Sequence, residues 1–225
     1  MFSVLFEVRP RSDQWDAYLD NAKRLRPELE KIDGFVDNIR YRSLTREGWI
    51  LSLSNWRDEK ALVRWRTHAL HHGAQEKGRT EILRDYHLRV GEVTRDTCPP
   101  AGHVLQEQRL DETEAGEAKS VTLVDTGMSL EKVRGGSADG IAEWLGLDQN
   151  AGGLTAWDVF EAVLTPGDVV LLMSWRDQGA GEAFERTSRL PDGARLRRVR
   201  VVRDYGMHDR REAPQYYPAV DKPAG

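Results

Sequence analysis

The chain has 225 residues, 33 of them basic and 37 acidic, which gives a net charge of −4 at pH 7. This balance argues against a general nucleic-acid-binding protein, because such proteins carry an excess of Lys and Arg. No apolar run approaches the roughly 20 residues of a membrane span, and the first residues lack the basic and apolar regions of a signal peptide. The single cysteine, Cys98, excludes an internal disulfide and a cysteine-based metal motif. We therefore expect a cytoplasmic protein that binds neither nucleic acid nor membrane.

The first part of the chain predicts the order strand, helix, strand, strand, helix, strand. Strands are expected at residues 2–8, 35–43, 49–56 and 86–93. An amphipathic helix capped by Asp13 should end near residue 32, because apolar residues recur there at steps of three and four. A second helix, capped by Asp58, should break around residues 67–71 and resume through Leu83. This order is that of the ferredoxin-like split βαβ unit.

The second part of the chain repeats the first. Trp56-Arg57-Asp58 recurs as Trp175-Arg176-Asp177, and Arg84-Asp85-Tyr86 recurs as Arg203-Asp204-Tyr205, each after 119 residues (175 − 56 and 203 − 84). Internal repetition indicates two copies of one structural unit. We predict a first module at residues 1–95, a linker at 96–118, a second, diverged module at 119–208 and a tail at 209–225. Trp56 and Trp175, kept in both copies, are expected in the core.

Two ferredoxin-like modules in one chain predict a particular α+β architecture. A four-stranded antiparallel sheet with helices on one face leaves its other face apolar, so it needs a partner sheet. Packing the two sheets of the chain together gives an intramolecular dimeric α/β barrel. Whether whole molecules pair further, as a homodimer of such pseudo-dimers, stays open.

Several short motifs of the first module lie in the order of one known family. They are Gly34-Phe35, the stretch from Leu53 to Glu59, Leu62-Val63-Arg64-Trp65, the residues His71, Gln75, Gly78 and Arg79, and Arg84-Asp85-Tyr86. In this combination the module resembles the antibiotic biosynthesis monooxygenase family of the dimeric α/β-barrel superfamily, whose relatives include IsdG-type haem-degrading enzymes. The resemblance implies a pocket between sheet and helices. There, a flat aromatic polyketide phenol, or haem, meets O2, often without flavin or metal.

The candidate chemistry lies between Trp65 and Gln75. In a continuous helix, Trp65, His68, His72 and Gln75 would share one face, and His71 would point to a neighbouring face. An indole can stack on a planar substrate, and a neutral histidine can accept a phenolic proton because its pKa is near neutral. We therefore take Trp65, His71 and His72 as candidate catalytic residues, and His68 and Gln75 as candidate substrate-binding residues.

Polar residues elsewhere in the first module are further candidates for substrate binding. Asn38 and Arg42 lie on the second strand, where alternation places Asn38, Arg40 and Arg42 on one face and Tyr41 on the other. Tyr86 opens the last strand and could orient a substrate oxygen. Which face of the second strand meets the pocket stays open.

Alternatives without catalysis accompany these candidates. Trp65 aligns with Phe184 of the second copy, which suits a packing role. His68, His71 and His72 align with Thr187, Leu190 and Pro191, so either the first copy alone is active or these histidines are solvated polar residues. His68 and His72 have the spacing of a metal pair, but no third ligand is near them, and no metal site is predicted.

The sequence thus predicts a small-molecule monooxygenase that oxidises an aromatic, phenolic or quinol-like substrate with O2, without flavin or metal. A haem-binding or haem-degrading protein is an alternative, with one imidazole as the iron ligand. Against it, Leu5-Phe6-Glu7-Val8 on the first strand lacks the Asn that IsdG-type enzymes place there. A non-catalytic ligand-binding protein of the same fold is a second alternative, because fold does not determine function.

Overall fold

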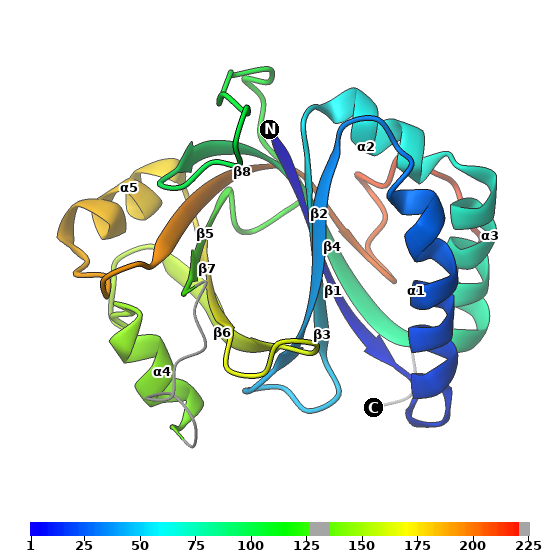
Figure 1. Ribbon diagram of the computed structural model, residues 1–225, viewed down its shortest axis with the longest axis horizontal. Helices are drawn as coiled ribbons and strands as arrows, with labels where there is room; N and C mark the ends of the chain where they lie inside the picture. Colours follow the sequence, from blue (N-terminus) through cyan, green and yellow to red (C-terminus); the bar gives the residue numbers. More distant parts are fainter. Residues whose placement is uncertain (127–135, 221–225) are drawn as a thin grey trace.

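The computed structural model describes residues 1–126 and 136–220, and its main feature is one closed β-barrel (Figure 1). The strands follow the order β1-β3-β2-β6-β7-β5-β8-β4, β4 pairs with β1 to close the ring, and every neighbouring pair is antiparallel. The first half of the chain contributes β1 (Phe2–Pro10), η1 (Ser12–Gln14), α1 (Trp15–Leu29), β2 (Phe35–Ser43), β3 (Ile50–Trp56), α2 (Glu59–Arg66), α3 (Ala69–Lys77), η2 (Gly78–Ile82) and β4 (Leu83–Asp96). The second half contributes β5 (Ser120–Asp125), α4 (Ala138–Trp144), β6 (Leu154–Ala162), β7 (Val169–Trp175), α5 (Gln178–Thr187) and β8 (Arg195–Gly206).

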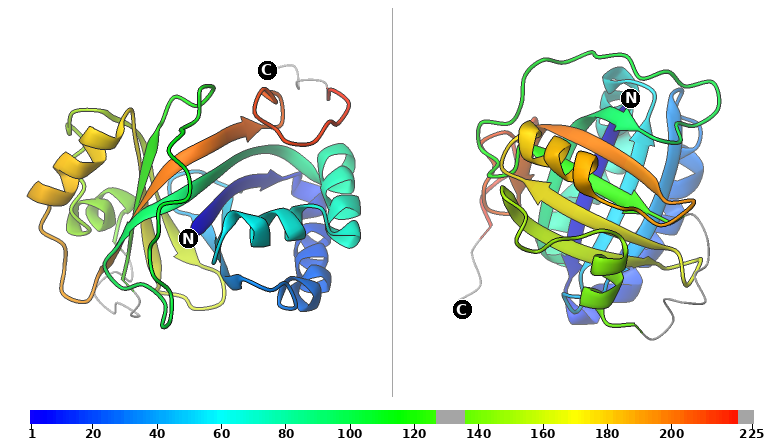
Figure 2. Two further views of the ribbon diagram at one scale, coloured as in Figure 1. Left: turned by 90° about the horizontal axis from the view of Figure 1, so that it is seen from above. Right: turned by 90° about the vertical axis from the view of Figure 1, so that its left-hand side faces the viewer.

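Each half supplies four neighbouring strands, and the halves meet along two seams. One seam joins β2 to β6, and the other joins β4 to β8. The helices of each half cover the outer side of its own strands, with α1, α2 and α3 at one end of the molecule and α4 and α5 at the other (Figures 1 and 2). The predicted α+β class and the intramolecular dimeric α/β barrel are therefore confirmed.

The repeated Trp-Arg-Asp motif ends a strand and begins a helix in both halves. The carboxylate of Asp58 accepts a hydrogen bond of 2.7 Å from the N–H of Ala61, and Asp177 accepts one of 2.9 Å from Ala180. Such a side-chain acceptor satisfies an N–H group of the first helical turn that has no partner within the helix. The Asp of the motif is therefore the N-cap of α2 and of α5.

A glycine immediately before the neighbouring strand lies against each of these capped helix ends. Gly34 has a φ of 90° and Gly153 a φ of 84°, in the left-handed region that favours glycine. A Cβ at either position would lie 2.6 Å from the Cβ of the alanine that donates to the cap, Ala61 or Ala180. Close approach of helix and strand therefore requires glycine here in both halves.

Apolar side chains fill the barrel and the space beneath the helices. The interior cluster joins both halves, and two further clusters lie under α1–α2 and under α4–α5. Trp56 and Trp175 are 1 % and 0 % exposed in the latter two clusters, which confirms their predicted place in the core.

The helical segment behind Trp65 breaks within residues 67–71, as predicted, and differs from the prediction only at its end. α2 ends at Arg66, and His68 has an extended backbone with φ −63° and ψ 130° before α3 begins at Ala69. The Thr67 hydroxyl donates to the carbonyl of Val63 at 2.9 Å and so helps to end α2. The helical chain then continues through η2 directly into β4, which begins at Leu83 rather than at Tyr86.

The chain after β8 packs back against the first half, beside α3. Figure 2 shows this segment next to the helices of the first half. The N–H of Met207 donates to the carbonyl of Tyr86 at 3.1 Å. Within residues 1–126 and 136–220, no helix has the length and apolar character needed to cross a membrane.

Candidate functional site

A cavity of about 240 Å³ lies between the first-half strands and the helices α1, α2 and α3. Its wall is mostly apolar and is formed by Val4, Phe6, Leu25, Leu29, Trp56, Leu62, Trp65, Ile82, Leu83, Leu88 and Val90. The second half of the chain completes the wall with Tyr205 of β8 and with Arg210, Gln215 and Tyr217 beyond it. A concave, largely apolar space with a few polar groups is the usual form of a small-molecule site.

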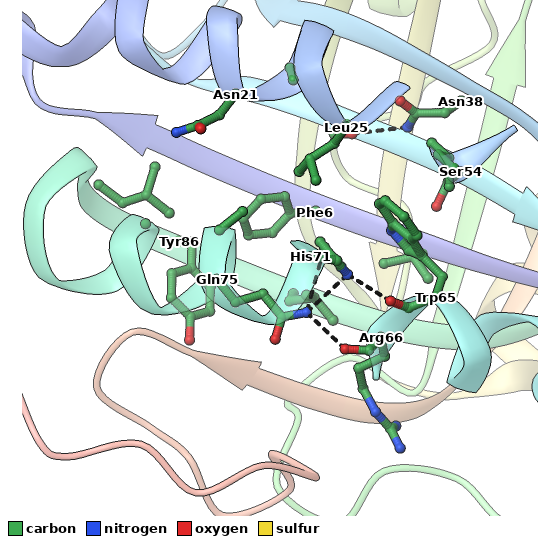
Figure 3. Close-up of a pocket in the computed structure, with 18 of the residues that line it drawn as sticks. Phe6, Asn21, Leu25, Asn38, Ser54, Trp65, Arg66, His71, Gln75 and Tyr86 are labelled. Carbon is green, nitrogen blue, oxygen red and sulfur yellow. Dashed lines mark hydrogen bonds between the residues drawn. The ribbon is translucent and has the colours of Figure 1, made fainter. Parts of the chain in front are cut away.

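His71 of α3 lies in this wall against Trp65 of α2 (Figure 3). The two rings stack, with centroids 4.3 Å apart and an angle of 13° between their planes. Nδ1 of His71 lies 3.0 Å from the carbonyl oxygen of Trp65. A carbonyl oxygen only accepts, so this hydrogen bond assigns the proton to Nδ1 and leaves Nε2 as an acceptor, 3.5 Å from the amide nitrogen of Gln75.

Burial lowers the pKa of His71 to about 4. The loss of hydration disfavours the imidazolium more than the Trp65 carbonyl stabilises it, and positive charge on His68 or His72 would disfavour it further. His71 is therefore neutral at pH 7. A neutral imidazole whose Nε2 carries no proton can accept one from a molecule bound in an apolar cavity.

Gln75 connects His71 to the C-terminal segment. Its amide nitrogen lies 3.1 Å from Nδ1 and 3.5 Å from Nε2 of His71, and only the unprotonated Nε2 can accept from it. Its amide oxygen accepts a hydrogen bond of 2.9 Å from the Tyr217 hydroxyl. The carbonyl of Arg66 lies 3.4 Å from the same amide nitrogen. These contacts fix the orientation of Gln75 between the imidazole and the residues that follow β8.

Away from Trp65, the cavity wall carries two arginines that surround a tyrosine hydroxyl. The guanidinium groups of Arg79 and Arg210 donate to Oη of Tyr86 at 2.7 and 2.6 Å. The ring of Tyr217 lies over both, with its centroid 5.5 Å from Cζ of Arg79 and 5.4 Å from Cζ of Arg210. Arg79 and Tyr86 are buried.

The structure brings five of the eight predicted site residues together. Trp65, His71, Gln75, Asn38 and Tyr86 all line the cavity. The side-chain nitrogen of Asn38 donates to Oγ of Ser52 and to the carbonyl of Leu53, while its oxygen has no partner among the described residues. The helix-facing side of β2 therefore carries Asn38, and the catalytic and binding roles of all five residues remain predictions.

His68 and His72 lie outside the cavity lining. The shared face that a continuous helix would give Trp65, His68, His72 and Gln75 does not form, because the chain is extended at His68 and α3 starts a new helical phase. His71 turns inward as a result, while His72 is exposed, with Nδ1 3.3 Å from the Tyr217 hydroxyl. The ring of His68 stacks on that of Trp65, with the ring centroids 5.7 Å apart.

Arg42, the third predicted residue outside the lining, belongs to the seam between the halves. Its guanidinium pairs with the carboxylate of Glu161 on β6. Tyr41, its neighbour on the other face of β2, packs in the barrel interior. Arg40 lines the cavity, so the strand does present one polar face to it, but Arg42 lies beyond the cavity end.

Sequence reasoning missed Arg210, left the role of Tyr217 open, and named Arg79 without giving it a role. Arg79 was visible as part of the family-like motif, seven residues before Tyr86. No signal pointed to Arg210 or Tyr217, because the tail has no equivalent in the first copy. Among the described residues, no group of three or more His, Cys, Asp or Glu side chains is placed to hold a metal ion.

The equivalent space in the second half is occupied by apolar side chains. Phe184, at the position of Trp65, is 6 % exposed and packs against Trp175 with ring centroids 5.5 Å apart. Leu190, at the position of His71, packs against the same cluster. These two positions carry no group able to transfer a proton.

Comparison with known proteins gives two kinds of similarity. The family model described as antibiotic biosynthesis monooxygenase matches residues 1–77. A protein of Pyricularia oryzae named jasmonate monooxygenase is 51 % identical over 224 residues, which cover 97 % of this chain and 99 % of that protein.

Two solved structures of aldoxime dehydratases resemble the fold. One, in complex with butyraldoxime, has a TM-score of 0.53 at 10 % identity and covers 89 % of this chain and 79 % of that one. The other has a TM-score of 0.52 at 12 % identity and covers 89 % of this chain and 80 % of that one. At these identities the likeness concerns the fold alone.

Proposed function

The chain belongs to the antibiotic biosynthesis monooxygenase family, and from this premise we propose that it transfers one oxygen atom of O2 to a small molecule bound in the first-half cavity. The observation that carries the proposal is the environment of His71. The imidazole is neutral, its Nε2 carries no proton, and it lines a mostly apolar cavity. A base of this kind suits removal of a proton from a substrate before it reacts with O2.

Jasmonate is the substrate that we propose first. The support is the named activity of the Pyricularia oryzae relative, which is 51 % identical over nearly the full length of both chains. The aromatic or phenolic class expected from the sequence is less well supported, because Trp65 already stacks with His71 and His68. An indole engaged in this way contributes to the wall rather than offering a platform to a flat ring.

The reaction requires a source of electrons. When one atom of O2 enters the substrate, the other is reduced to water and takes two electrons and two protons. The substrate itself supplies them if a methylene group becomes a carbonyl, whereas an added reductant supplies them if a C–H becomes C–OH. In either case His71 and the apolar wall would hold the reacting atoms away from bulk water.

Oxygen uptake and product mass spectrometry test the proposal. Purified protein is given jasmonate, a hydroquinone or a phenol under 18O2, with and without NADPH. We expect one labelled oxygen atom in the jasmonate product, lost in His71→Ala and kept in His72→Ala, whose side chain lies outside the cavity. Binding of jasmonate without oxygen uptake under any of these conditions would support the non-catalytic alternative instead.

Haem is a second candidate ligand, favoured by one observation. Nδ1 of His71 is held by a backbone carbonyl, which is how a ligating histidine is usually oriented with Nε2 toward the metal. His71 lines the cavity, whereas His68 and His72 do not. A haem titration should then give a saturable Soret band that is lost in His71→Ala and kept in His72→Ala. Without a saturable band, the haem candidate is wrong.

A further inference from the structure

The cavity wall carries positive charges that the proposed proton transfer to His71 does not use. Five arginines line the cavity, Arg26, Arg40, Arg66, Arg79 and Arg210, while none of its lining residues is an Asp or a Glu. Arg26 pairs with Glu30 outside the cavity. The other four form no ion pair with any residue in 1–126 or 136–220; Arg79 is buried and the remaining three are partly buried. By contrast, the buried arginines Arg89 and Arg197 each pair with a carboxylate.

Arg79 and Arg210 are the most closely placed of these four arginines, since both donate to the same Tyr86 oxygen. The other hydrogen bonds that these two guanidinium groups donate also go to neutral acceptors. Arg79 donates to the carbonyls of Met207 and Pro218, and Arg210 to that of Gln215. Two like charges held together in a poorly hydrated place repel each other. An anion between them would remove this cost.

Tyr86 is oriented to help such an anion. A phenol oxygen has two lone pairs and one hydrogen. Here both lone pairs receive guanidinium N–H groups, so the hydroxyl hydrogen must point elsewhere, and no acceptor for it is found among the described residues. A phenol held in this way can only donate to a further partner, as an anionic oxygen requires.

We propose that Arg79, Tyr86 and Arg210 bind the carboxylate of an amphipathic substrate, whose apolar body lies along the cavity toward Trp65. A carboxylate suits the cluster because guanidinium groups donate to its two oxygens in a planar arrangement. This inference deepens the proposed function and rests on it. It also selects acids over the corresponding neutral esters.

The cluster would act as a positioning site. Gln75 and His71 lie between Tyr86 and Trp65 in Figure 3, and the ring of His71 stacks on Trp65. A substrate anchored at Tyr86 would therefore extend past Gln75 and present one fixed part of its body to Nε2 of His71. The distance between the carboxylate and the reacting carbon would decide which position is oxidised.

Binding without turnover tests the inference. Titration calorimetry under nitrogen compares jasmonate with its methyl ester, and cyclohexylacetate with its methyl ester as a second, unrelated pair. We expect the wild type to bind each acid at least about 10-fold more tightly than its ester, as charge-assisted hydrogen bonds imply. Arg210→Gln should remove most of this preference by weakening acid binding about 10-fold, with ester binding changed less than about 2-fold.

Arg211→Gln is the matched control. Arg211 is adjacent in sequence but exposed, and it pairs with Asp209 on the surface. This variant changes the net charge by the same amount and should keep the preference for acids. Equal effects of the two variants would mean long-range electrostatics and would overturn the inference.

The remaining outcomes separate the inference from the proposed function. If the wild type binds acid and ester equally well, the inference is wrong even if jasmonate is oxidised. If acids bind selectively through Arg210 but jasmonate is not oxidised, the proposed function fails and the carboxylate site stands. Should Arg210→Gln lower the melting temperature, Tyr86→Phe and Arg79→Lys replace it, and acid binding must fall in at least one of them while ester binding persists.

Discussion

The two halves of the barrel share a skeleton but differ in what lies between sheet and helices. Both keep the Trp-Arg-Asp motif, whose Asp caps a helix, and a glycine that lets that helix approach the strands. The first half has a 15-residue α1 and encloses a cavity, whereas the second half has a 7-residue α4 and fills the corresponding space with apolar side chains. The Trp-Arg-Asp motif therefore serves the fold in both halves, while the cavity combines a repeated residue such as Tyr86 with unrepeated ones such as His71 and Arg210.

The second half also supports the site of the first. Tyr205 and the segment after it close the cavity near Tyr86 and carry Arg210 and Tyr217. An isolated first module would lack these residues. One half thus forms most of the cavity wall, and the other half completes it.

The largest effect that we expect is on catalysis, from the residue that most distinguishes the halves. His71→Ala should lower the rate of oxygen uptake about 10²- to 10⁴-fold, as removal of a general base does. His72→Ala, on the neighbouring exposed position, should change it less than about 2-fold, because its side chain is outside the cavity. Steady-state kinetics with both variants measures the difference. Similar losses in the two would show that His71 is not the base.

In the second half the corresponding position should affect stability instead. Phe184→Ala removes a buried ring at the position of Trp65 and should cost about 3–5 kcal/mol of the free energy of unfolding. Leu164→Ala, a substitution of a 90 % exposed side chain in the same half, should cost less than about 0.5 kcal/mol. Urea unfolding measures both. If Phe184→Ala leaves stability unchanged but abolishes activity of the folded protein, the second half has a site of its own.

Replacing His71 by leucine makes the first half like the second at this position and should change how stability depends on pH. The pKa of His71 is about 4 when folded and near 6.5 when unfolded. As pH falls from about 6.5 to about 4, the unfolded chain takes up a proton that the folded chain does not, so stability falls. His71→Leu should abolish up to about 3 kcal/mol of this loss. Unfolding measured from pH 7 to pH 4 in wild type, His71→Leu and His72→Leu gives the answer, and a parallel decline in all three would contradict it.

The smallest effects that we expect are equal in the two halves. Asp58→Ala and Asp177→Ala each remove a helix N-cap and should cost about 1 kcal/mol. The corresponding Asn variants keep an acceptor and should cost only a few tenths of a kcal/mol. Thermal unfolding compares the four variants. A cap that matters in only one half would mean that the repeated motif has lost its structural role in the other.

The sequence alone predicted the barrel because local signals and repetition agreed. Strand periodicity, the predicted cap at Asp58 and the recurrence of motifs after 119 residues all pointed to two modules of the same kind. The direction of His71 was not predictable in this way. One extended residue, His68, shifts the helical phase, and no composition signal marks the exact residue at which a helix breaks.

The polar end of the cavity was harder to predict for a different reason. Tyr86 meets Arg210 across 124 residues, and Arg79 meets the carbonyl of Pro218 across 139. Such contacts depend on where the tail packs, and neither periodicity nor repetition describes a segment that occurs once. Arg42 was misplaced similarly, since its partner Glu161 lies on the other half of the barrel.

The seam between β2 and β6 shows a consequence of having two copies of one unit in a single chain. Arg42 and Glu161 are 119 residues apart, so they are the same position of the two copies, and they face each other across the pseudo-two-fold axis. In a dimer of two identical subunits, a residue on that axis meets itself, and either an arginine or a glutamate there would meet a like charge. His87 faces Gly206 in the same relation across the β4–β8 seam. Two copies in one chain thus allow unlike residues on the symmetry axis, which two identical subunits cannot have.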